Sequence, residues 1–149
     1  MKFSFRQCIR LCLAVLLSTF LLSSCISCAS ATSQKNSPEG LGSAVRVFAY
    51  ALRWGDYKAA AIFIPPNQQQ RYWDLADEFN RKVRIVDYEV RQVILEPGST
   101  AGIVILNFRY YQTADPNMRT RNIQQRWSYA ENEKLWRVTE NGLDVLLQK

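Results

Sequence analysis

The sequence of 149 residues contains no histidine, and its four cysteines all lie within the first 28 residues. Histidine is the usual general acid or base near neutral pH and the commonest nitrogen ligand of transition metals. Without cysteine, the rest of the chain has no disulfide, thiolate nucleophile or thiolate metal ligand. These absences exclude Ser-His-Asp and Cys-His catalysis. They favour a non-catalytic domain, for which we expect no cofactor and no metal site.

The first 24 residues have the three parts of a signal peptide. A basic head precedes an apolar run from Leu11 to Leu22, and the small residues Ser23 and Ser24 follow. The apolar run is shorter than the roughly 20 residues that a membrane-spanning helix needs. An ordinary secretory signal cut nearby and an uncleaved N-terminal anchor are the alternatives.

The run Leu22-Ser23-Ser24-Cys25 resembles the lipobox of bacterial lipoprotein precursors. The resemblance implies that Cys25 is lipidated, with palmitate among its acyl chains, and becomes the mature N-terminus in the cell envelope. Cys28 is a second, poorer site. If the organism is Gram-negative, Ile26 and Ser27 lack the aspartate associated with inner-membrane retention, which implies sorting to the outer membrane, facing the periplasm.

Removal of the signal lowers the net charge of the chain. Of 19 lysines and arginines, three (Lys2, Arg6 and Arg10) lie in the signal, which leaves 16 against 13 acidic residues and an excess of +3 rather than +6. The remaining basic residues alternate with acidic ones instead of forming a stripe. We therefore expect no nucleic-acid partner. The expected contacts are the membrane, through covalent lipid, and either a second copy or another envelope protein.

The chain after the signal divides into a tether and one domain. Residues 26–40 are small and polar, which predicts a flexible tether over 25–40. Residues 41–149 are the right length for a single domain with one core.

The first part of this domain has helical periodicity. Three helices are predicted, the first two meeting at Gly55-Asp56 and the third beginning after Pro65-Pro66 with Asn67 as N-cap. The apolar residues that recur at helical spacing are Leu41, Val45, Phe48 and Leu52 in the first helix and Tyr72, Leu75, Phe79 and Val83 in the third.

From Arg84 onward the period changes to two, which predicts strands at about 85–95, 101–112, 119–130 and 134–140. A three-residue loop or a bulge in the first hairpin brings apolar residues opposite one another, whereas a two-residue loop does not. The predicted pairs are Val90–Leu106, Tyr88–Phe108, Val86–Tyr110 and Asp87–Arg109, with Tyr129–Trp136 and Trp127–Val138 in the last hairpin. The fold class is therefore α+β, with three N-terminal helices on a curved, four-stranded antiparallel sheet.

The inner face of this sheet carries no carboxylate before Glu140, so it offers almost no general base. Its polar exceptions are Gln92, Arg121, Gln125 and the tyrosine hydroxyls. Four of its residues are candidates to line a small aromatic pocket, and the alternative is that they simply pack the core. They are Tyr88, Tyr110, Gln125 and Trp127.

The outer face is charged, but the alternation of the strands places several apolar residues on it as well. Ile103 and Ile105 are the centre of this predicted patch, with Val93, Leu95 and Leu135 beside them and Arg109 at the charged rim, which also includes Arg137. An apolar patch rimmed by charge is typical of a protein contact or dimer interface. The alternative is that a terminus or loop covers it.

The Gly55-Asp56 junction, the stretch from Tyr57 to Phe63 and the run Leu135-Trp136-Arg137-Val138 resemble the nuclear transport factor 2-like superfamily over residues 41–142. The resemblance implies a cone-shaped fold, whose members include ketosteroid isomerases, dehydratases, polyketide cyclases and non-catalytic modules. Catalytic members commonly use Asp, His or Tyr inside the cone, and no inward Asp or His matches here. We expect a lipid-anchored envelope lipoprotein with a non-catalytic binding domain. The alternative is a small-ligand-binding cone with isomerase- or cyclase-like activity, acting through Tyr88, Tyr110 or Glu140.

Overall fold

The computed structural model describes residues 37–98 and 100–148. The predicted signal peptide, the lipobox with Cys25, and Cys28 lie outside these residues. The first described helix, α2 (Pro38–Arg53), begins three residues before the expected domain boundary at 41. Ser37 caps it, because its hydroxyl oxygen accepts a hydrogen bond from the Gly40 amide at 3.2 Å. Residues 38–40 therefore form the first turn of a helix rather than the end of a tether.

Two further α-helices and one 3₁₀ turn precede the sheet. They are α3 (Tyr57–Ala61), η1 (Pro66–Gln68) and α4 (Gln69–Lys82). Asp56 caps α3 as predicted, and Gly55 takes the positive φ of 70° that ends the preceding helix. The prediction of Asn67 as N-cap is wrong. Pro65 and Pro66 direct the chain into η1, which contains Asn67, and α4 starts after it without a side-chain cap.

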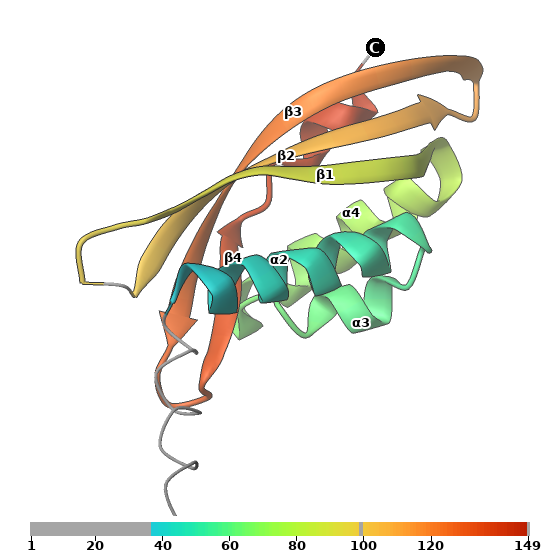
Figure 1. The fold of residues 1–149 in the computed structure, drawn as a ribbon. Coiled ribbons are helices and arrows are strands. Elements are labelled where there is room, and N and C mark those ends of the chain that lie inside the picture. Colours follow the sequence, from blue (N-terminus) through green and yellow to red (C-terminus); the bar gives the residue numbers. More distant parts are fainter. Residues whose placement is uncertain (1–36, 99, 149) are drawn as a thin grey trace, which may run out of the picture. The chain divides into compact units, whose positions relative to one another are not determined.

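The sheet is antiparallel in the order β1-β2-β3-β4, and α2, α3 and α4 lie on one side of it (Figure 1). Its strands are β1 (Val83–Leu95), β2 (Ala101–Gln112), β3 (Asp115–Ala130) and β4 (Leu135–Glu140). A final 3₁₀ helix, η2 (Leu143–Leu147), buries Leu143 and Leu146. This element was not predicted.

The register of the hairpins confirms most of the predicted pairs. Val90 pairs with Leu106, Tyr88 with Phe108 and Asp87 with Arg109 in the first hairpin. In the last one, Tyr129 pairs with Trp136 and Trp127 with Val138.

Two irregularities in the register of β1 show where the remaining predictions for this strand are wrong. One lies between Ile85 and Asp87, so that Ile85, not Val86, pairs with Tyr110. The other lies between Val90 and Gln92. An extra residue reverses the alternation of a strand. The side chains of Val93 and Leu95 therefore face the core, and that of Ile94 faces outward.

The core lies between α2, α4 and the inner face of the sheet. Phe48, Phe63 and Trp127 pack edge to face with ring centroids 5.6 to 6.1 Å apart. Gly102 sits where β2 meets α2, since a Cβ there would approach the Leu41 side chain to 2.6 Å. The described residues, 37–98 and 100–148, thus form one compact unit with a core of its own. Within the described residues, no helix is long and apolar enough to cross a membrane.

Candidate functional site

Three of the four predicted pocket residues lie fully inside the core. Gln125 has no exposed surface, and both ends of its amide are bonded within the fold. Its Oε1 accepts a hydrogen bond from Trp127 Nε1 at 3.1 Å, and its Nε2 donates to the Asn141 carbonyl oxygen at 3.1 Å. Tyr110 and Trp127 are equally buried. This arrangement matches the alternative in which these residues pack the core. Gln125 and Trp127 bond to each other, whereas the buried Tyr110 hydroxyl has no hydrogen-bond partner among the described residues.

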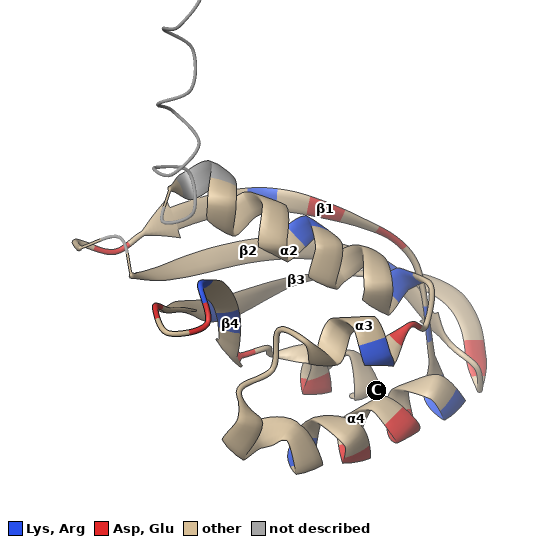
Figure 2. Cartoon of the chain, turned by 90° about the horizontal axis from the view of Figure 1, so that it is seen from below, with Lys and Arg blue, Asp and Glu red and all other residues tan. Residues whose placement is uncertain are grey.

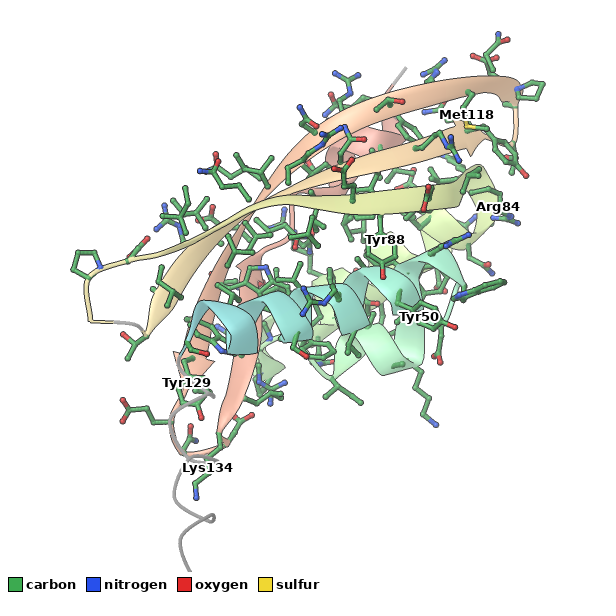
Figure 3. All side chains as sticks on the ribbon, viewed as in Figure 1. Tyr50, Arg84, Tyr88, Met118, Tyr129 and Lys134 are labelled. Atoms are coloured by element: carbon green, nitrogen blue, oxygen red, sulfur yellow. The ribbon has the colours of Figure 1, made fainter. Side chains whose placement is uncertain are left out.

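Tyr88, the fourth, is separate from the other three. It extends from the edge strand β1 toward α2 (Figure 3), where its hydroxyl donates to the Arg46 carbonyl oxygen at 3.3 Å. Tyr88 also borders a shallow hollow of about 160 Å³ that Asp87, Asn107 and Arg109 line. The structure therefore brings Tyr88 next to Arg109, which the sequence placed on the other face.

A larger cleft, of about 270 Å³, lies between the start of α4 and the segment joining β4 to η2. Its charged lining consists of Arg71, Glu140 and Asp144. Tyr72 also lines it, but its hydroxyl donates to the Tyr57 carbonyl oxygen at 2.9 Å, and burial raises the pKa of Tyr72 far above its usual value. This phenol stays protonated at physiological pH and is no general base. In the described part of the chain, no three side chains of the metal-binding types converge.

The outer face of the sheet carries a small cluster of isoleucines, which we call the isoleucine patch: Ile94, Ile103 and Ile105. Ile94 and Ile103 are cross-strand partners, and Ile105 is paired with Gln92. Ile94 is 43% exposed, and the other two are half-buried. The helices α2, α3 and α4 lie on the opposite side of the sheet (Figure 1), so none of them covers this patch.

The membership of this patch differs from the predicted one. Val93, Leu95 and Leu135 pack against the core instead of joining the outer face. Ile94, which parity placed inside, takes their place because of the irregularity in β1. The two successive polar residues Arg91 and Gln92 interrupt the alternation of the strand. They are the signal that could have located the bulge from sequence.

Polar and charged pairs surround the isoleucine patch. Arg126, which is paired with Ile103, lies 2.8 Å from a carboxylate oxygen of Glu96 and 3.9 Å from one of Glu140. The Asn107 amide donates to the Asn122 side-chain oxygen at 2.6 Å. An apolar centre with a polar rim is the usual anatomy of a protein interface.

Two arginines predicted on this face have different roles. Arg109 lies at the rim as expected, with its guanidinium 3.6 Å from Asp87. Arg137 instead turns to the loop after α3. There it donates to the carbonyl oxygens of Ile62 and Ile64 and pairs with Glu133. The same loop bonds to the edge of β4, where the Val138 amide donates to the Phe63 carbonyl oxygen at 2.8 Å. Arg137 therefore closes the sheet edge and does not contribute to the patch.

No protein-family model matches the sequence, and no curated protein sequence matches it. The structure resembles a ketosteroid isomerase-like protein from Erwinia carotovora atroseptica, with a TM-score of 0.53 and 11% identity over 72% of this chain and 92% of that one. It also resembles a SEC-C motif-containing protein from Rhodopseudomonas palustris. There the TM-score is 0.56 and the identity 15%, over 71% of this chain and 77% of that one. The likeness to the ketosteroid isomerase-like protein supports the nuclear transport factor 2-like fold, and at these identities both likenesses show the fold alone.

Proposed function

We propose that this protein is a lipid-anchored, non-catalytic module of the bacterial cell envelope that binds a protein partner through the outer face of its sheet. The observation that carries the proposal is the isoleucine patch. It is an apolar centre on a helix-free sheet face, ringed by ordered polar pairs. The partner is a second copy of the chain or another envelope protein.

The filled interior supports a role without catalysis. In a catalytic cone the substrate needs a space beside a titratable group. Here Gln125, Tyr110 and Trp127 occupy the centre of the fold with no exposed surface, and both polar ends of Gln125 are already bonded.

The lipid anchor is tested by metabolic labelling with a palmitate analogue. Cys25→Ala is expected to abolish the label and release the protein from the membrane fraction, because the lipidated thiol is then absent. Cys28→Ala is the matched control and is expected to keep the label. Labelling that persists in Cys25→Ala and disappears in Cys28→Ala would contradict the assignment of Cys25.

The interface is tested by placing a charge in the patch. Ile105→Asp in the lipidated chain is expected to remove the cross-linked species formed by the wild-type protein in cells, because a buried unpaired carboxylate opposes association. Met118→Asp is the matched control, since Met118 is exposed at the opposite end of the sheet (Figure 3). Cross-linking that Ile105→Asp leaves unchanged would contradict an interface at this patch.

A second candidate function, binding of a small ligand, is favoured by the cleft that Arg71, Glu140 and Asp144 line. Native mass spectrometry of the chain from residue 26 onward tests it. An added mass that disappears in Arg71→Ala would support this function. A bare mass in the wild-type protein purified from its own cells would contradict it.

A further inference from the structure

Helix α2 exposes a second apolar stripe in addition to the one that packs in the core. Val47 and Tyr50, followed by Trp54 at the C-cap, stand at spacings of three and four residues and are 53%, 57% and 65% exposed. Residues at these spacings lie on one face of a helix. The core stripe with Val45, Phe48 and Leu52 has no exposed surface or almost none, so α2 is apolar on two faces.

The charges that flank this second stripe have one sign. Arg46 and Arg53 are exposed on the same helix, and residues 40–55 contain no acidic residue. In Figure 2, the described part of α2 carries blue positions and no red one. The Arg53 guanidinium lies 5.5 Å from the centroid of the Trp54 ring, and the rings of Tyr50 and Trp54 are 6.1 Å apart.

Two acidic side chains lie close to this face. Asp87 of β1 is 3.8 Å from Arg53 but is shared with Arg109. Asp56 is committed to capping α3 through its bond with the Ala59 amide. Asp87 is therefore balanced by two arginines, and Asp56 keeps its charge at the first turn of α3, outside the stripe.

Helix α4 shows what an ordinary solvated face looks like in the same domain. Its exposed positions include Arg71, Asp74 and Asp77, and Lys82 pairs with Glu78 at 2.6 Å. Both signs occur along it in Figure 2, with acidic positions between basic ones. The exposed apolar stripe of α2, flanked by arginines and by no acidic residue between positions 40 and 55, is therefore not a general feature of the surface helices of this domain.

The position of α2 in the chain makes it the described element nearest in sequence to the proposed anchor. Ser37 is the N-cap of α2, and Cys25 precedes it by twelve residues. Twelve residues span at most about 40 Å when fully extended. If Cys25 carries lipid, α2 is the first described element beyond the bilayer surface.

We propose that the face formed by Val47, Tyr50 and Trp54, with Arg46 and Arg53 beside it, docks on the headgroup layer of an anionic lipid bilayer. Tryptophan and tyrosine favour the membrane interface, and arginines bind anionic headgroups while their stems stay in apolar surroundings. The proposal rests on the lipid anchor proposed above. Docking through α2 leaves the isoleucine patch, on the other side of the sheet, free for a partner.

The test uses the chain from residue 26 onward, which contains the whole compact unit and Cys28 as its single thiol. Cys28 is coupled to a maleimide lipid in vesicles of phosphatidylethanolamine and brominated phosphatidylglycerol, which quenches tryptophans that enter the bilayer interface. Trp127 and Trp136 are buried, so Trp54 and Trp73 report. We expect quenching in the wild-type chain, its loss in Trp54→Ser and its retention in the matched control Trp73→Ser, where the substituted tryptophan belongs to α4.

The contribution of the two arginines to membrane binding is tested separately. Without the maleimide coupling, Arg46→Gln and Arg53→Gln are each expected to weaken partitioning into phosphatidylglycerol vesicles about fivefold.

Several outcomes would overturn the proposal: no quenching in the coupled wild-type chain, equal quenching in Trp54→Ser, or equal binding to neutral phosphatidylcholine vesicles. A dimer that Trp54→Ser dissociates in the absence of lipid would assign the face to a second copy instead. Because the assay supplies a synthetic lipid, its result is independent of whether Cys25 is acylated in cells.

Discussion

The two faces of the sheet are built from alternate residues of the same strands, yet they differ in how their polar groups are satisfied. On the inner face, Gln125 is held between Trp127 and Asn141 without access to water. On the outer face, Asn107 and Arg126 use neighbouring side chains and remain partly open to solvent. A buried polar network that is fully satisfied specifies one packing arrangement. The difference indicates that the interior contributes stability, and it leaves the outer face as the surface for the binding role proposed above.

The largest effect that this comparison predicts is on the inner face. Trp127→Ala removes a fully buried indole that contacts Phe48 and Phe63 and should lower the free energy of unfolding by about 3–5 kcal/mol. Trp54→Ala is the control, because its exposed ring should change this quantity by less than about 0.5 kcal/mol in the lipid-free chain. Urea unfolding monitored by circular dichroism measures both. A similar decrease in the free energy of unfolding for both variants would contradict the view that burial of the indole determines its contribution to stability.

A sharper test uses two adjacent glutamines that point to opposite faces. Gln125→Ala leaves Trp127 Nε1 and the Asn141 carbonyl oxygen without their partner and should cost about 1–3 kcal/mol. Gln124→Ala, on the exposed face, should stay within about 0.5 kcal/mol of the wild-type chain. The same urea experiment reports the difference between the variants. Equal values would contradict the structural role of the buried amide.

The smallest expected effect is electrostatic and lies at the start of β3, where the Asp115 and Arg119 side chains are partly exposed. The Arg119 guanidinium, bonded to Asp115 at 2.6 Å, lowers the pKa of that carboxyl below its usual value. A carboxyl whose pKa is lower in the folded state stabilises the fold above its unfolded pKa of about 3.9, and this contribution is lost as pH falls through the folded pKa.

Arg119→Gln should therefore reduce the loss of stability on acidification below about pH 4. The measurement is the urea midpoint as a function of pH, and Arg121→Gln, an exposed arginine two residues away, is the control. An unchanged pH profile in Arg119→Gln would show that this pair does not contribute.

Much of the fold was predictable because its signals are local. The Gly55-Asp56 junction ended one helix and capped the next as expected, and matching apolar residues across the first hairpin identified the Val90–Leu106 pair. The pair Trp127–Val138 followed from the same reasoning in the last hairpin. These features depend on neighbours in sequence or on one turn.

The candidate site was only partly predictable. Ile103, Ile105 and Arg109 lie on the outer face as expected, but Ile94 replaced Val93 and Leu95 after the bulge near Arg91. A single extra residue exchanges the two faces of everything beyond it. The exposed stripe of α2 was not predicted either, because the same helix also carries a core stripe and periodicity alone does not say which apolar residues are covered.

The sequence by itself determined the class of the fold, the order of its elements and the scarcity of catalytic groups, because composition and periodicity carry that information directly. Only the tertiary structure decided which apolar residues remain uncovered. Val47 and Tyr50 stay exposed, whereas Leu143 and Leu146 are buried by a short C-terminal turn that no local pattern indicated. Burial depends on which segments meet in space, and that is set by the curvature of the sheet and the packing of the helices against it.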